Sequence, residues 1–198
     1  MFTQSTLIKK AGNLWRQATT APFLNAIADG TLPREALNRW MVQDYHFADA
    51  LTSFQAVTLA KTPRRFREPL LGGLVAMDME MDWFERQASR RRLELEAPLH
   101  PVCRHYCDFL LRVAYSEPYQ VALAVLFGVE ASYLAAWSRL KPAGRYKEFI
   151  DRWSNKRFIA YVNSLWMLAE ENPHKTNQRH FNLVLEHECE FWRMAWEG

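Results

Sequence analysis

One stretch of the chain, residues 122–137 (ALAVLFGVEASYLAAW), is apolar almost all round. A helix with no polar face has nothing to offer water, so this segment is expected at the centre of a helical bundle. Its single carboxylate, Glu130, would be buried there together with Tyr133, which lies on the same helical face. A buried glutamate needs a hydrogen-bond donor, a metal, a ligand or a second acid that shares its proton. The alternative is a structural ion pair between Glu130 and an arginine.

The composition fits one helical domain over residues 1–198. Hydrophobic residues make up 49% of the chain and aromatic residues 14%, which is typical of a globular protein. No segment alternates polar and apolar residues as a half-buried strand would, so the sequence predicts an all-α fold. The formal charge of +3 does not indicate a nucleic-acid partner, and the basic runs at 63–67 and 89–93 are expected at helix ends.

Targeting signals are not evident in the sequence. The N-terminal segment lacks a basic region followed by an apolar core, and no run reaches ~18 uninterrupted apolar residues. We therefore expect no membrane partner and a cytoplasmic location. The three cysteines, Cys103, Cys107 and Cys189, form no zinc-type CxxC pair and are expected as reduced thiols.

Apolar periodicity and proline positions divide the rest of the chain into further helices. The helices are expected over residues 6–18, 22–30, 33–62, 66–92, from 101 onward, 146–153, 157–171 and 175–196.

Three of these helices carry an acid among aromatic or other apolar residues, namely Asp44, Glu80 and Glu188. In a pocket of low dielectric constant two carboxyl groups raise each other's pKa, so one can hold a proton while the other remains a base. Such a pair suits hydrolysis by an activated water. The surrounding rings suit a flat heteroaromatic ligand, and an aspartate could bind its amino group.

Several other chemistries lack their sequence signatures. The chain has no GxSxG elbow, Walker loop, Rossmann glycine pattern or HExxH pair. A di-iron site would need Glu-x-x-His pairs, whereas Glu80 precedes Phe84 and Glu130 precedes Tyr133. We therefore expect neither a metal nor another cofactor, and a carboxylate-bridged di-iron oxidase is kept as an alternative.

Four stretches together resemble the TenA (thiaminase II-like) family, in order and over nearly the whole chain. They are PFLNAIADGTLPREALNRWMVQDYHF (22–47), AMDMEMDWFER (76–86), LFGVEASYLAAW (126–137) and LEHECEFWRMAW (185–196). The resemblance implies a haem-oxygenase-like helical bundle, no obligatory metal, a homo-oligomer (dimer or tetramer) and a role in salvage of the thiamine pyrimidine.

The resemblance also implies roles for individual residues. By position, Asp44 matches the acid that holds the pyrimidine amino group, and Glu188 matches the C-terminal catalytic glutamate. The pocket rings would be Phe47, Tyr106, Tyr133 and Trp153, of which Phe47 and Trp153 stand where tyrosine is common. The family's cysteine branch has its nucleophile where this chain has Val129, so covalent thiaminase chemistry is not expected.

Glu80 and Glu130 instead resemble the glutamate-type branch, whose members hydrolyse aminopyrimidines. The expected function is hydrolysis of 4-amino-5-aminomethyl-2-methylpyrimidine or its N-formyl derivative, a small-molecule aminopyrimidine. Glu80 and Glu130 would share acid and base work around a water, with Glu188 in support. The second alternative is a non-catalytic pyrimidine-binding or regulatory protein.

Overall fold

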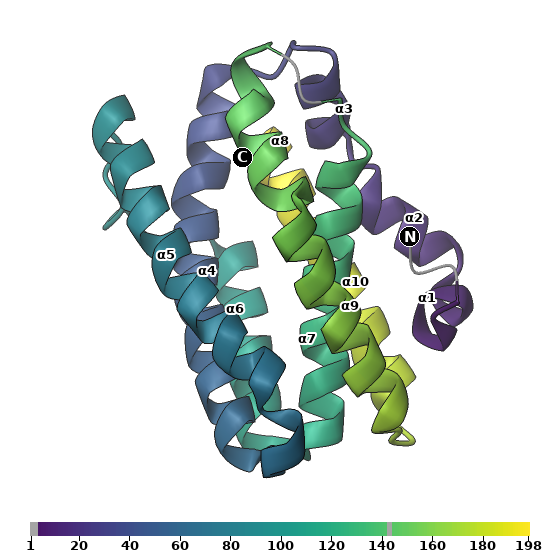
Figure 1. Ribbon diagram of the computed structural model, residues 1–198. Helices are drawn as coiled ribbons and strands as arrows, with labels where there is room; N and C mark the ends of the chain where they lie inside the picture. The colour runs from purple at the N-terminus through teal and green to yellow at the C-terminus, as the bar shows by residue number, and fades with distance from the viewer. Residues whose placement is uncertain (1–3, 142–143) are drawn as a thin grey trace.

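The computed structural model describes residues 4–141 and 144–198, and every regular element in these ranges is a helix. The long helices run side by side as a bundle, with α5 at one edge and α1 and α2 at the other (Figure 1). The all-α prediction is confirmed. The α-helices are α1 (Thr6–Ala11), α2 (Asn13–Thr19), α3 (Pro22–Ala28), α4 (Arg34–Lys61), α5 (Glu68–Arg91), α6 (Pro101–Ser116), α7 (Tyr119–Ser138), α8 (Lys147–Ser154), α9 (Lys156–Glu171) and α10 (Asn177–Glu197), with 3-10 turns η1 (Arg64–Phe66) and η2 (Gly144–Tyr146).

Helix α7 is the centre of the bundle, as its apolar sequence predicts. It packs against α2, α4, α6, α8, α9 and α10. It is long and apolar enough to cross a membrane, but 83% of its most apolar window is buried inside the protein. Gly128 lets α10 approach closely, because a Cβ there would lie 3.2 Å from the Phe181 ring. The apolar surface of α7 is thus covered by its own neighbouring helices.

The first predicted helix, over residues 6–18, is wrong as a single element. The structure has two short helices, α1 and α2, that meet at Gly12. Gly12 adopts φ 55° and ψ −118°, a backbone conformation that residues with a Cβ rarely adopt. The apolar spacing continues through the break, which is why periodicity did not reveal it. The turn lets both short helices pack on α10.

A cluster of aromatic rings joins α4, α5, α7 and α8. Trp40 of α4 is fully buried, and its ring centroid lies 5.6 Å from those of both Trp137 and Trp153. Trp83 of α5 meets Trp153 edge-on, with ring centroids 5.2 Å apart. Each such pair contributes ~0.5–1.5 kcal/mol beyond its buried area. The cluster therefore fixes the short helix α8 against the three longer ones.

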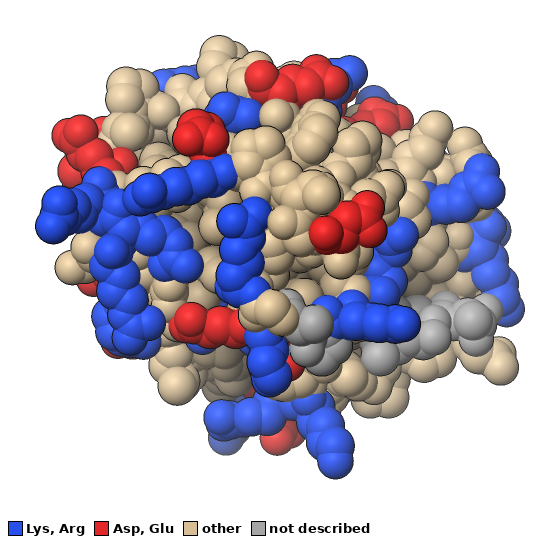
Figure 2. Space-filling view, turned by 90° about the horizontal axis from the view of Figure 1, so that it is seen from above, with Lys and Arg blue, Asp and Glu red and all other residues tan. Residues whose placement is uncertain are grey.

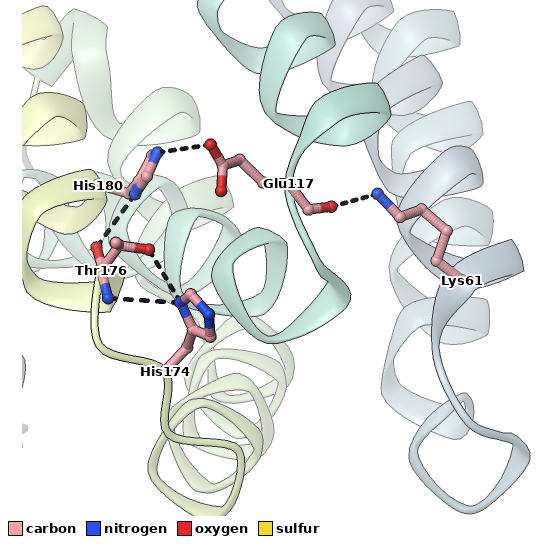
Figure 3. Close-up of polar contacts among 5 residues, drawn as sticks. All are labelled: Lys61, Glu117, His174, Thr176 and His180. Carbon is pink, nitrogen blue, oxygen red and sulfur yellow. Dashed lines mark hydrogen bonds and ion pairs between the residues drawn. The ribbon is translucent and has the colours of Figure 1, made fainter.

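Polar contacts join the helix ends at the lower end of the bundle in Figure 1. The Lys61 ammonium at the end of α4 donates to the backbone oxygens of Ala114 and Glu117, at the end of α6. His180 Nε2 lies 3.5 Å from the Glu117 carboxylate, and its Nδ1 lies 3.0 Å from the Thr176 carbonyl oxygen (Figure 3). The two Lys61 contacts satisfy carbonyl groups at the end of α6 that lack partners within that helix.

Basic side chains gather at the other end of the molecule, on the side where α5 ends (Figure 2, left). Helix α5 ends with Arg90 and Arg91, and Arg92 caps it in the left-handed conformation with φ 57°. Cations near a helix C-terminus are favoured by the helix dipole. The expectation that the 89–93 run lies at a helix end is confirmed.

Two glycine substitutions should separate backbone strain from helix propensity. Gly12→Ala should lower the free energy of unfolding by ~1–3 kcal/mol, because alanine is strained at φ 55° although nothing lies within 4 Å. Gly72→Ala, inside α5 and equally unobstructed, should raise it by ~0.5–1 kcal/mol. Urea titration of both variants measures the difference, and a Gly12→Ala variant as stable as the parent would contradict the description of this break.

Candidate active site

One cavity opens between α4, α5, α7, α8 and α9. Six of the eight predicted site residues line it: Asp44, Phe47, Glu80, Glu130, Tyr133 and Trp153. The remaining lining residues are apolar: Ala48, Leu51, Met77, Val129 and Phe158. The cavity therefore combines three carboxyl groups with an aromatic and aliphatic wall.

Asp44 is held by Tyr133, which lines the same cavity. The tyrosine hydroxyl donates to Asp44 Oδ2 over 2.7 Å, and its ring stacks on Trp192 at a centroid distance of 5.9 Å. Burial raises the pKa of Asp44 well above its usual range, the Tyr133 hydrogen bond opposes this, and the charges of Glu80 and Glu188 add to it. Burial therefore favours the protonated form of Asp44, which offers one O–H donor and an acceptor oxygen.

Glu80 is positioned by Trp153 of α8. The indole Nε1 donates to Glu80 Oε1 over 2.9 Å. The Trp153 ring is held by Trp137, with ring centroids 4.9 Å apart. Burial raises the pKa of Glu80, while the Arg152 charge and the Trp153 hydrogen bond lower it. The orientation of this carboxyl group is thus set by the aromatic cluster.

Glu130 is the carboxyl group without a partner. Within residues 4–141 and 144–198 it has no hydrogen bond or ion pair to another side chain, although it is only 7% exposed. Burial raises its pKa to about 8, and the charges of Glu80 and Glu188 add to this effect. The arginine ion pair considered from the sequence is absent among the described residues. At neutral pH Glu130 holds a proton that it can donate.

Glu188 and Tyr106 lie one layer behind the cavity and do not line it. The Tyr106 hydroxyl donates to Glu188 Oε1 over 2.8 Å, and the Tyr106 ring lies 4.6 Å from the Phe47 ring. Burial raises the pKa of Glu188 to about 8, and the Tyr106 hydrogen bond opposes the rise. These two residues therefore act on the cavity through the Phe47 ring and through the electrostatic interaction of Glu188 with Asp44 and Glu130.

A model of the TENA/THI-4/PQQC family matches residues 8–198. The chain belongs to this family. It is 28% identical over 209 residues to a Glycine max protein named "Probable bifunctional TENA-E protein", and the match covers 96% of this chain and 91% of the relative. It is 22% identical over 218 residues to the "Aminopyrimidine aminohydrolase" of Helicobacter pylori, with 100% of both chains covered.

A solved structure extends the likeness from sequence to fold. A TenA homologue from Pyrococcus furiosus superposes with a TM-score of 0.90 at 27% sequence identity, and the match covers 99% of this chain and 100% of that one. The resemblance to the TenA family and the helical-bundle fold predicted from it are confirmed. The relative named as an aminohydrolase indicates hydrolase chemistry in this family at low identity.

The cavity of this TenA-family chain has no cysteine in its wall. Val129 is 3% exposed and lines the cavity beside Glu130. Two thiols, Cys103 and Cys107, are buried on α6, and the third, Cys189, lies on α10. In the part of the chain that the structure describes, no group of three His, Cys, Asp or Glu side chains could hold a metal ion, so these residues lend the di-iron alternative no support.

The sequence did not indicate two residues at or near this cavity. Phe158 lines the cavity from the first turn of α9, and Arg152 of α8 acts on the Glu80 charge. Phe158 follows Asn155, whose side chain caps the helix at the amides of Arg157 and Phe158. That capping residue was the available signal for where α9 begins and hence which way its first ring points. Arg152 had no comparable signal.

The raised pKa of Glu130 makes stability depend on pH. The pKa of a glutamate carboxyl group is ordinarily near 4.5, and that of Glu130 is about 8, so the folded state binds this proton more tightly than the unfolded state does. The free energy of unfolding therefore falls as the pH rises from about 4.5 to about 8. Glu130→Gln should therefore stabilise the protein by ~1–3 kcal/mol at pH 8 and have little effect at pH 4.5. Thermal unfolding at both pH values tests this, with the exposed Glu171→Gln as the control for loss of one charge. Equal effects of Glu130→Gln at both pH values would contradict it.

Proposed function

We propose that this TenA-family protein hydrolyses a C–N bond of a thiamine-derived aminopyrimidine in pyrimidine salvage. The substrate would be 4-amino-5-aminomethyl-2-methylpyrimidine or its N-formyl derivative. The observation that supports this most is the pair Glu80 and Glu130, which line one cavity from α5 and α7, with an apolar valine where a nucleophile would otherwise stand. The name of the Helicobacter pylori relative also supports it.

Asp44 and the aromatic wall suit recognition of the pyrimidine. An aminopyrimidine edge presents an N–H donor beside a ring nitrogen acceptor, and a protonated carboxyl group presents the complementary acceptor and donor. Tyr133 holds Asp44 in place for two such hydrogen bonds. The rings of Phe47, Phe158 and Trp153 line the same cavity and offer flat apolar surface to a heteroaromatic ring.

The two glutamates supply the two proton transfers that hydrolysis needs. One carboxylate accepts a proton from a water while the water oxygen bonds to carbon, and one carboxylic acid gives a proton to the departing nitrogen. For the aminomethyl substrate the products are the hydroxymethyl pyrimidine and ammonia. For the N-formyl substrate they are the free amine and formate. Glu188 would support the pair by keeping the proton on Glu130.

Thiamine itself should be a poor substrate. Its cleavage in the cysteine branch depends on a thiolate, and the side chain at this position is Val129. A valine cannot form a covalent intermediate, and a carboxylate is a weak replacement for a thiolate in displacing the thiazolium.

A product assay tests the proposed function. The purified protein is incubated separately with thiamine, the aminomethyl pyrimidine and its N-formyl derivative, and pyrimidine products are separated chromatographically. We expect hydrolysis of at least one aminopyrimidine, little thiamine cleavage, and a loss of at least about 100-fold in the Glu130→Gln control. Thiamine cleavage that survives replacement of all three cysteines, or no turnover of either aminopyrimidine, would overturn the proposal.

A further inference from the structure

Helix α8 places two consecutive side chains on the turn of α5 that carries Glu80. Trp153 donates to the Glu80 carboxyl group, as described above. Arg152 reaches the same turn from beside it, and its Nη2 lies 3.4 Å from the backbone oxygen of Met79. Of this pair only Trp153 has a role in the proposed function, so the position of Arg152 needs an explanation of its own.

The Arg152 guanidinium is fixed in place by α5. Its Cζ lies 4.6 Å from the centroid of the Trp83 ring, a cation–π contact. The Trp83 ring is itself anchored, because its Nε1 donates to Glu148 Oε1 over 3.0 Å. Arg152 Nε is buried without a hydrogen-bond partner among the described residues. A buried arginine nitrogen left unpaired is costly, which indicates that the position of this charge serves a purpose beyond local stability.

Arg152 makes the surroundings of the two cavity glutamates unequal. The charged and titratable groups that act on Glu80 are Asp44 from α4, Glu130 and Tyr133 from α7, and Arg152 from α8. Arg152 is the one cation among them in the part of the chain that is described. Glu130 instead interacts with Glu80, Glu188, Tyr106 and Tyr161, none of which is a cation. Glu80 also keeps partial exposure, whereas Glu130 is buried.

We propose that Arg152 is a positioning residue that assigns the roles of the pair, so that Glu80 is the base and Glu130 is the acid. This inference rests on the proposed function and deepens it. The Glu80 carboxylate takes a proton from the attacking water, and the Glu130 carboxylic acid gives its proton to the departing nitrogen. After product release the proton on Glu80 and the charge on Glu130 exchange through solvent, which restores the starting state. Arg152 touches neither the water nor the substrate and acts through Glu80.

The electrostatics of the two carboxyl groups agree with this assignment. Arg152 and the Trp153 hydrogen bond both oppose the rise in the pKa of Glu80 that burial causes. Nothing comparable opposes the rise for Glu130, whose pKa is about 8. Removal of the Arg152 charge should therefore raise the pKa of Glu80 and make the two groups more alike.

The test compares Arg152→Gln with Arg152→Lys, which keeps the charge. Arg65→Gln is the control, because Arg65 also stacks on a ring, with its Cζ 4.4 Å from the Phe66 centroid, but lies in η1, outside the cavity. The first measurement is the titration of the Glu80 carboxyl carbon by ¹³C NMR without substrate, assigned by its loss in Glu80→Gln. The second is the pH dependence of kcat/KM on the aminopyrimidine that the product assay identifies.

Arg152→Gln should move the Glu80 titration and the acidic limb of kcat/KM upward together by about one pH unit. At the acidic end this is about a tenfold loss, with KM changed less than kcat. Arg152→Lys should restore most of both, and Arg65→Gln should move neither. A Glu80 titration that does not move in Arg152→Gln would overturn the assignment whether or not turnover is found. A moved titration without turnover of any pyrimidine would instead count against the proposed function and leave the Arg152–Glu80 coupling established.

Discussion

The burial of Glu130 in the middle of an apolar helix is the constraint on which the rest of the structure depends. Helix α7 can exist only if other helices cover all its sides, and α2, α4, α6, α8, α9 and α10 do so. The same cover removes water from the Glu130 carboxyl group and raises its pKa to about 8. The packing that stabilises the fold therefore also sets the pKa of Glu130. Burial of an unpaired carboxyl group lowers the free energy of unfolding, which an apolar residue at this position would not do.

The aromatic cluster fixes the geometry of the site around Glu130. Trp40, Trp137 and Trp153 pack α8 against α4 and α7, and Trp153 then fixes the Glu80 carboxyl group at 2.9 Å. In the same cavity Tyr133 fixes Asp44 at 2.7 Å. Both acids are held by ring donors whose positions are set by packing, while Glu130 keeps its hydrogen-bonding capacity for a ligand or water. A rigid shell around one unpaired carboxylic acid suits the proton donor that the proposed hydrolysis needs.

Much of this could be predicted from the sequence, and the rest depends on features that periodicity does not carry. The apolar run around Glu130 predicts a central helix. Asp44 and Glu80, each noted as an acid among apolar and aromatic residues of its helix, both line the cavity. Helical faces do not encode depth, so Glu188 and Tyr106 lie behind the wall although their faces point inward. The break at Gly12 depends on a positive φ that the apolar spacing hides, and Arg152 acts across a contact between α8 and α5 that no local pattern reveals.

The most direct test of the account is a double-mutant cycle on turnover with Glu80→Gln, Glu130→Gln and the combined variant. If the two carboxyl groups act as one unit, each single substitution should remove most of the activity, and the combined variant should be scarcely slower than either single one. Folding of the three variants is verified by thermal unfolding in the same samples. Losses that multiply in the combined variant, or full turnover in either single variant, would contradict the claim that a shared glutamate pair activates water in this cavity.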